Sequence, residues 1–391
     1  MGKYFLIVGI LISVNSVCYF SDESKNIILN GHYHFSNSWI SSVWSGCWAR
    51  NDGKIELPGE HLVVPIKSDG FSGGRYLTHI YVNRKEKGEV NKAQVTVIIN
   101  GIFGSPTSGL VRQIAQQAMA KGHHVIALGN PLGLWGLKQI PTYTVANFVQ
   151  EAEVYLDLIR QSFEWMKNME LTTGEVNLVG VSYGAFLSAI MKTMDSKMSS
   201  PVITGMTTLL SVPLQMGIAL RNMDHLLFET KQYAKFPDWF FEVMSVPFCA
   251  IPPRHYVGKQ TIKLAKAIFG YAGFQRSLAD KTILLDELYG LNKIPKDEKL
   301  RKIWRNNFTF AEYINEFAND LGELMDSSYG NLYYWLDQIS SDEFQIFASL
   351  DDPLNEDVTW PSNENLLLIN YGGHYGFRGF NFYDQFLYSI F

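Results

Sequence analysis

The sequence predicts an α/β fold in which a mostly parallel central sheet is flanked by helices and carries a large helical cap insertion. Three observations predict it. From residue 95 onward, short apolar runs rich in β-branched residues alternate with longer amphipathic segments. The alternation stops at Pro213, where a helical and aromatic stretch over residues 214–338 begins, and it returns at residue 344. Alternating strands and helices indicate parallel β-α-β units, and the interruption indicates a cap inserted between two strands.

The individual elements follow from the period of their apolar residues. Short runs with no polar break are typical of strands buried on both faces, whereas apolar residues at every third or fourth position are typical of helices. We therefore expect strands over residues 95–100, 124–129, 176–181, 204–212, 344–348 and 365–369. We expect helices over residues 107–121, 145–169, 185–191 and 383–391, and within the cap over residues 225–235, 260–268 and 310–325.

The N-terminal part of the chain has a different character. Residues 22–94 look β-rich and irregular, with three tryptophans among glycine turns. Before them, Lys3 and an apolar run over residues 4–14 are followed by small and polar residues, which is the layout of a secretory signal peptide. We therefore expect a signal peptide over residues 1–18, core segments over 19–213 and 339–391, and a cap over 214–338. Cys18 leaves a lipoprotein anchor as an alternative.

Composition and charge exclude some classes of function. The chain has 391 residues, of which 47% are hydrophobic and 18% charged, so it can bury a large core. The net charge is −5, and the absence of a basic block argues against nucleic acid as a partner. Cys47 and Cys249 could pair in an oxidising compartment, or they could be two unrelated buried thiols.

The most informative motif is Gly-Val-Ser-Tyr-Gly at residues 180–184. A strand-like run precedes it and a helical segment follows, so Ser182 would stand at a sharp strand-to-helix turn. Small residues on either side permit such a turn, which exposes the serine oxygen and aims the first helical N–H groups at the reaction centre. This pattern is typical of a nucleophilic serine, and the alternative is a serine that only caps the helix.

A nucleophilic serine needs a base, and the base needs an orienting carboxylate. In this fold class the three residues follow in the order Ser, acid, His, each just past a strand. Asp351 and Asp352 follow one predicted strand, and His374 follows the next, in a glycine-rich segment. We expect Ser182 to be the nucleophile, Asp352 the acid and His374 the base. Asp352 is preferred because it directly precedes the turn residue Pro353, and Asp351 would then be a solvated neighbour.

Two backbone N–H groups should stabilise negative charge on the substrate oxygen. One donor should be the N–H of Tyr183, the residue after the nucleophile. The other should come from the loop over residues 100–105, Asn-Gly-Ile-Phe-Gly-Ser, whose glycines let the backbone approach the substrate. We expect the N–H of Ile102 to be this donor, with Phe103 as the next candidate. The alternative is an ordinary glycine turn into a helix.

The sequence predicts neither a cofactor nor a metal. His32 and His34 have a spacing that could supply two ligands from a strand, but no further ligand nearby completes a site. The cap contains large apolar residues that could line an acyl pocket or simply form core. These residues are Met216, Met223, Phe228, Phe236, Trp239, Phe240, Phe241 and Met244.

From residue 95 to residue 391 the chain resembles the α/β-hydrolase superfamily and, within it, the branch of YheT-like and ABHD-type esterases and lipases. The shared segments are the 100–105 loop, Gly-Val-Ser-Tyr-Gly, Leu-Asp-Asp-Pro at 350–353 and Gly-Gly-His-Tyr-Gly-Phe at 372–377. The last two are the most specific, and the resemblance implies the same three catalytic residues. The chain departs from the branch at Asn100, where a histidine is usual, and in its longer aromatic cap and its secretion signal.

Together these observations predict an exported serine hydrolase, an esterase or lipase that cleaves a small-molecule ester or lipid through an acyl-enzyme. Acyl transfer, thioester hydrolysis or peptide hydrolysis would use the same three residues. A catalytically silent lipid-binding protein could also share the fold. The apolar cap suits an acyl chain and would also allow peripheral contact with a membrane.

Overall fold

The computed structural model describes residues 37–49, 55–84, 92–250, 258–360, 365–378 and 380–391. The expected signal peptide, the lipoprotein cysteine and the histidine pair at 32 and 34 all lie outside the described residues. Among the residues that are described, no helix combines the length and apolar character needed to cross a membrane.

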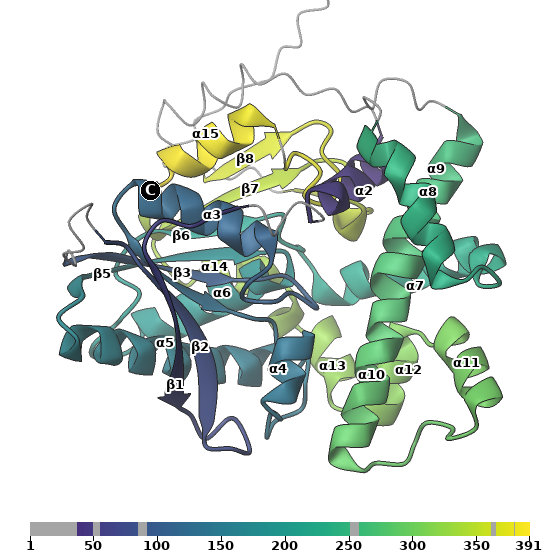
Figure 1. Ribbon diagram of the computed structural model, residues 1–391, viewed down its shortest axis with the longest axis horizontal. Helices are drawn as coiled ribbons and strands as arrows, with labels where there is room; N and C mark the ends of the chain where they lie inside the picture. The colour runs from purple at the N-terminus through teal and green to yellow at the C-terminus, as the bar shows by residue number, and fades with distance from the viewer. Residues whose placement is uncertain (1–36, 50–54, 85–91, 251–257, 361–364, 379) are drawn as a thin grey trace, which may run out of the picture.

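A single eight-stranded sheet forms the centre of the molecule, in the order β1-β2-β4-β3-β5-β6-β7-β8 (Figure 1). The first two strands are antiparallel to their neighbours, and the strands from β4 to β8 are all parallel. The strands are β1 (Glu60–Lys67), β2 (Arg75–Val82), β3 (Ala93–Ile99), β4 (His124–Leu128), β5 (Thr172–Val181), β6 (Thr207–Leu210), β7 (Phe344–Ser349) and β8 (Leu366–Ile369). Each strand expected from residue 95 onward is present, with its ends shifted by a few residues.

Helices cover both faces of this sheet (Figure 1). Alternate residues of β3 show the division, because Val97 and Ile99 join one apolar cluster and Ile98 joins the other. One face packs against α3 (Gly109–Ala120) and α15 (Asn381–Ser389), and the other against α5 (Phe148–Asn168), α6 (Tyr183–Ser196) and α14 (Leu332–Leu336). The short helix α4 (Leu134–Lys138) follows β4. A mostly parallel sheet between two helical layers, interrupted by a helical insertion, is the α/β-hydrolase fold, so the predicted fold class is confirmed.

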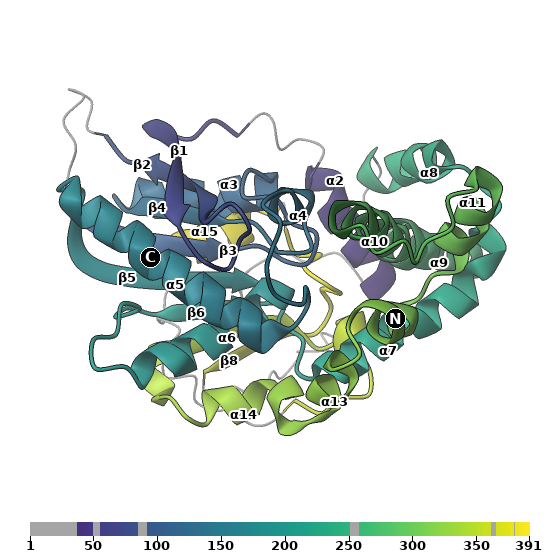
Figure 2. The same ribbon diagram turned by 90° about the horizontal axis from the view of Figure 1, so that it is seen from below.

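The described part of the chain between β6 and β7 consists of helices joined by turns and loops. Its elements are α7 (Met216–Thr230), η2 (Lys231–Tyr233), α8 (Asp238–Ala250), α9 (Lys259–Lys266), the π-helix η4 (Ala267–Gln275), α10 (Arg276–Tyr289), α11 (Glu298–Asn307), α12 (Phe310–Phe317), α13 (Leu321–Asp326), η5 (Ser328–Gly330) and α14. Most of them gather to one side of the sheet (Figure 2). The single helix expected over 310–325 is two helices, since α12 ends at Phe317 and α13 begins at Leu321. The 3-10 turns η6 (Ser341–Glu343) and η7 (Pro353–Asn355) flank β7.

The expectation of a β-rich region before β1 is wrong for residues 38–49, which form the helix α2 (Ser38–Ala49). Asn37 begins the helix, because its side-chain oxygen accepts hydrogen bonds from the N–H groups of Trp39 and Ile40. Ile40 and Val43 then lie on one face, buried against cap residues. Tertiary packing of this face therefore outweighs the strand preference of the tryptophans.

Cys249, at the end of α8, is disulfide-bonded. The alternative in which it is an unpaired buried thiol is therefore wrong. The side chain of Cys47 lies outside the part of the chain that is described in atomic detail, so the pairing of these two cysteines stays a prediction.

Candidate active site

Ser182 occupies a strained turn between β5 and α6. Its φ of 54° and ψ of −123° lie outside the usual regions for a residue with a side chain. The turn is also crowded: a Cβ at Gly184 would lie 2.3 Å from the carbonyl oxygen of Asn100, and one at Gly180 would lie 2.4 Å from the Cα of Ala185. The two glycines are therefore required by close backbone approach, as the motif predicted.

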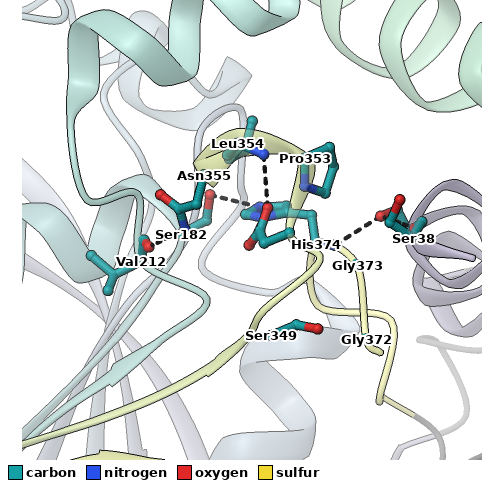
Figure 3. Close-up of polar contacts among 12 residues, drawn as sticks. Ser38, Ser182, Val212, Ser349, Pro353, Leu354, Asn355, Gly372, Gly373 and His374 are labelled. Atoms are coloured by element: carbon teal, nitrogen blue, oxygen red, sulfur yellow. Dashed lines mark hydrogen bonds and ion pairs between the residues drawn. The ribbon is translucent and has the colours of Figure 1, made fainter. Parts of the chain in front are cut away.

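The three residues expected to act together meet at the carboxyl ends of the parallel strands. Figure 3 shows Ser182 and His374 next to each other. Nε2 of His374 lies 2.9 Å from Oγ of Ser182, and Nδ1 lies 3.0 Å from Oδ2 of Asp352. Asp352 is buried, and its other oxygen accepts a hydrogen bond of 2.9 Å from the N–H of Leu354. This geometry allows His374 to take a proton from Ser182 while Asp352 holds the imidazole in the required tautomer.

Asp351 has a structural role that the sequence did not suggest. Its Oδ1 accepts hydrogen bonds from the hydroxyl of Ser349 at 2.6 Å and from the N–H groups of Gly372 and Gly373 at 2.8 and 2.7 Å. The expectation of a solvated neighbour is therefore wrong. The carboxylate instead anchors the loop that carries His374, because it lies across the two backbone groups just before the histidine.

The loop over residues 100–105 approaches Ser182 closely, since a Cβ at Gly101 would lie 3.2 Å from the Cβ of Ser182. Asn100 holds the loop in shape. Its oxygen accepts a bond of 2.8 Å from the N–H of Gly101, and its amide donates to the carbonyl of Ser105 and the hydroxyl of Ser108. The side chain of Asn100 therefore stabilises the conformation of this loop.

The two expected oxyanion donors both border the site. Ile102 and Tyr183 line the same cavity as Ser182 and His374. Tyr183 is the first residue of α6, so its N–H has no partner within the helix. The position of both residues fits a role in stabilising negative charge on a substrate oxygen, and that role stays a prediction.

Ser182 opens into a cavity of about 420 Å³. No aspartate, glutamate, lysine or arginine is found among its described lining residues. The cap side is formed by Met216, Ala219, Leu220 and Met223 of α7 and by Ile268, Phe269, Gly273 and Phe274 of η4. Within the described residues, no group of three or more His, Cys, Asp or Glu side chains could hold a metal ion.

Only two of the large cap residues singled out from the sequence line this cavity, namely Met216 and Met223. Phe228 and Trp239 are exposed, by 64% and 62%. The aromatic rings at 236, 240 and 241 instead pack with one another and around Tyr271, in a separate cluster of the cap. The spacing along α7 explains why the two methionines reach the cavity, because Met216, Leu220 and Met223 lie on one face of the helix.

A buried glutamate lies behind the nucleophile turn. The hydroxyl of Tyr183 donates to Oε2 of Glu151 at 2.5 Å, and the N–H of Ala146 donates to Oε1 at 2.6 Å. Burial raises the pKa of Glu151 to about 7, although the bond from Tyr183 opposes the rise. One signal in the sequence could have found this residue: Glu151 lies on the apolar face of its helix, with Phe148 and Tyr155.

Comparisons with known proteins extend these findings only slightly. No family model and no curated protein matches the sequence. Among solved structures, an esterase from Pyrobaculum calidifontis has 12% identity and a TM-score of 0.45, over 88% of this chain and 84% of that chain. FphF, a fluorophosphonate-binding serine hydrolase from Staphylococcus aureus, has 10% identity and a TM-score of 0.40, over 85% and 99%. Carboxyl esterase 2 from Tuber melanosporum has 11% identity and a TM-score of 0.38, over 77% and 71%.

These identities and scores are low, so the similarities carry no weight for activity. The resemblance to the YheT-like and ABHD-type branch stays a prediction.

Proposed function

We propose that the protein is a serine hydrolase that cleaves carboxylic esters with an apolar acyl group. The observation that carries this proposal is the continuous hydrogen-bonded series from Ser182 through His374 to the buried Asp352, at the edge of an apolar cavity. A helix-capping serine has no need of such a base, and a structural histidine has no need to contact a strained serine.

In the proposed reaction, His374 accepts the proton of Ser182 as the serine oxygen attacks the ester carbonyl. The N–H groups of Ile102 and Tyr183 would stabilise the negative charge on the carbonyl oxygen. The intermediate collapses to an acyl-enzyme, and His374 gives its proton to the departing alcohol. Water then attacks the acyl-enzyme by the same route and releases the acid. Asp352 stays ionised and stabilises the imidazolium at each stage.

The lining of the cavity supports an apolar acyl group. The described cap residues that line the cavity are all apolar side chains or glycine, and no charged side chain is available among the described lining residues to neutralise a charged substrate. Burying an unpaired charge against such a wall is costly, whereas burying methylene groups is favourable. A neutral ester of a fatty or aromatic acid therefore suits the site better than a charged peptide.

The direct test is covalent labelling by a fluorophosphonate probe, which reacts with activated serines. We expect the parent protein to be labelled at Ser182 and the Ser182→Ala variant to be silent. Ser188→Ala is a matched control, because Ser188 is buried in α6, the helix that follows Ser182, and it donates to the carbonyl of Gly184, outside the cavity lining. Equal labelling of the Ser182→Ala variant, or no labelling of the folded parent, would contradict the proposal.

A panel of p-nitrophenyl esters of graded acyl length would then define the substrate. Acyl transfer, thioester hydrolysis and peptide hydrolysis share the same chemistry, so product analysis with a competing alcohol, a thioester and a peptide separates them. A protein that binds lipid without turnover would show no product in any of these assays.

We also propose that the protein is exported. Two observations support this: the signal-peptide pattern over residues 1–18, and the disulfide at Cys249, since disulfides persist mainly in oxidising compartments. Determining the N-terminal residue of the protein isolated from its source tests the proposal. An intact residue 1 in the mature protein would contradict cleavage.

Peripheral membrane contact through the cap is a further proposal of this kind. Trp239, Val243 and Val246 are more than half exposed and recur along one face of α8. Apolar side chains in this arrangement can enter a lipid interface. Sedimentation with phospholipid vesicles, compared between the parent and a Trp239→Ser variant, tests it. Equal sedimentation of the two would contradict it.

A further inference from the structure

The helix α2 contacts the loop that carries His374. The N–H of His374 donates a hydrogen bond of 2.8 Å to Oγ of Ser42, and this hydroxyl in turn donates to the carbonyl of Ser38 at 2.7 Å. Ser42 is buried, with 3% of its surface exposed. Figure 3 shows Ser38, on this helix, beside Gly373 and His374. A segment 332 residues away along the chain therefore holds the backbone of the candidate base.

The contact is close enough to explain the glycines around His374. Gly373 has a φ of +53°, and a Cβ at this position would lie 2.1 Å from the carbonyl oxygen of Ser38. A Cβ at Gly376 would lie 2.4 Å from the carbonyl of Ser41. These glycines therefore do more than let the loop turn, because they admit the backbone of α2 directly against it.

The opposite side of α2 packs on the cap. In both ribbon views the helix lies between the sheet and the cap helices α8 and α9 (Figure 1, Figure 2). Ile40 and Val43 share an apolar cluster with Phe248 of α8. The ring of Trp39 meets Phe269 of the π-helix at 6.0 Å, and Phe269 in turn stands edge-on to the ring of His374, also at 6.0 Å.

We propose that Ser42 is a positioning residue for the base. Because α2 packs on the cap on one side and on the histidine loop on the other, Ser42 links the position of His374 to the N-terminal segment and the cap. The proposal rests on the proposed function. Asp351 fixes the two N–H groups before the histidine, and Ser42 fixes the N–H of the histidine itself. Small errors in the position of a catalytic group have large effects on rate, so the loss of one anchor should reduce turnover while substrate binding persists.

The test compares Ser42→Ala with two further variants. Ser42→Thr retains a hydroxyl, and Ser41→Ala removes a neighbouring buried hydroxyl that donates to the carbonyl of Ser38 at 2.9 Å. The concentration of active sites is determined by fluorophosphonate titration, so a loss of folded protein is separated from a loss of rate per site. We expect Ser42→Ala to lower kcat per active site roughly tenfold or more with KM within about twofold. Ser42→Thr should recover most of this loss, and Ser41→Ala should resemble the parent.

A second readout does not require ester hydrolysis. The proton shared between Nδ1 of His374 and Asp352 is followed by NMR, with the signal assigned through a His374→Gln variant. A base that has drifted from Asp352 should lose the downfield position of this signal, because its hydrogen bond to the carboxylate is weakened. An unchanged signal in Ser42→Ala, or an equal loss of kcat in Ser41→Ala, would overturn the proposal. Failure of the proposed function alone would remove the kinetic effects and leave the NMR shift.

Discussion

The cavity has two walls: a sheet wall, formed around Ser182, His374 and the loop over residues 100–105, and a cap wall, formed by α7 and η4. These two walls are held together in different ways. On the sheet wall, each polar side chain of the site has identified partners: Asn100 holds its loop, Asp351 and Ser42 hold the histidine loop, and Asp352 holds the imidazole. On the cap wall, the contacts are apolar packing and ring contacts, such as Phe274 against Phe103 at 5.7 Å. Hydrogen bonds fix direction, whereas apolar contacts fix only shape and volume.

The hydrogen bonding of the sheet wall suits catalysis, and the apolar packing of the cap wall suits the recognition of the acyl chain. Proton transfer and charge stabilisation depend on atoms held within hydrogen-bond reach, so they belong on strand ends and tightly tied loops. Discrimination between acyl chains depends on the space left for them, which side-chain packing sets. Substitutions on the sheet wall should therefore change the rate for all substrates, and those on the cap wall should change the ratio between substrates.

The π-helix of the cap wall shows how shape is set there. Its cavity-lining residues are Ile268 and Phe269, and Gly273 and Phe274, two pairs separated by five positions. In an α-helix, residues five apart lie on different sides, because a turn takes about 3.6 residues. The wider turn of the π-helix brings both pairs to the cavity. Gly273 leaves space at this wall, since a Cβ there would meet only the carbonyl of Ile268.

The largest predicted effect is that of the carboxylate on the sheet wall. Asp352→Asn should lower kcat by about ten-thousandfold, because an amide at this position favours the wrong imidazole tautomer and cannot stabilise the imidazolium. Asp351→Asn is the matched control. It keeps an oxygen for the two glycine N–H groups and should cost only about tenfold. Steady-state kinetics on one ester measure both, and the reverse ranking would move the role of the acid to Asp351.

The second prediction concerns Glu151 and the pH dependence of stability. The pKa of this carboxyl is about 7 in the folded protein against an ordinary value of 4.5, so the folded state holds the proton over this range while the unfolded state releases it. The contribution of Glu151 to stability is therefore greatest below pH 4.5 and falls by about 3 kcal/mol as pH rises to 7. Glu151→Gln should remove this part of the decline.

Urea unfolding at pH 5 and at pH 8 checks this prediction. The free energy of unfolding of Glu151→Gln, relative to that of the parent, should be higher at pH 8 than at pH 5. Glu153→Gln, at an exposed position of the same helix, should follow the parent at both. Parallel pH profiles for Glu151→Gln and the parent would show that Glu151 does not hold a proton in the folded state.

A smaller loss is expected at Asn100. Asn100→Ala removes the hydrogen bonds that shape the loop beside Ser182, while the backbone N–H groups of that loop remain. Removing an oxyanion donor outright costs about a hundred- to a thousandfold, so loosening its loop should lower kcat by about ten- to a hundredfold. The loss should be similar for short and long esters. A loss confined to long esters would place Asn100 among the determinants of acyl preference.

The smallest effect is expected on the cap wall. Met216→Trp should lower the ratio of rates on long and short esters by roughly tenfold, because the larger side chain fills space that the acyl chain occupies. Phe228→Trp enlarges an exposed residue of the same helix and should leave the ratio unchanged. Rates on p-nitrophenyl esters of two lengths measure both. An unchanged ratio in Met216→Trp would leave the cap without a part in specificity.

Several features of the molecule could be predicted from local patterns. The strands after residue 95 are continuous apolar runs, and a sheet buried on both faces requires such runs wherever it forms. The geometry around Ser182 was accessible because its glycines signal a turn that only small residues permit. The proximity of Ser182, Asp352 and His374 followed from their places after successive strands, since parallel strands bring their carboxyl ends to one edge.

By itself, then, the sequence determined the fold class, the helical nature of the cap and the three residues that meet at the edge of the sheet. Only the tertiary structure decided what surrounds them. Whether Asp351 faces solvent or the histidine loop depends on segments distant in the chain, as does the choice of cap residues that reach the cavity. The same holds for α2, whose apolar face has a partner only once the cap is in place. Local patterns report the preferences of neighbouring residues, and contacts between distant segments exist only after the chain has packed.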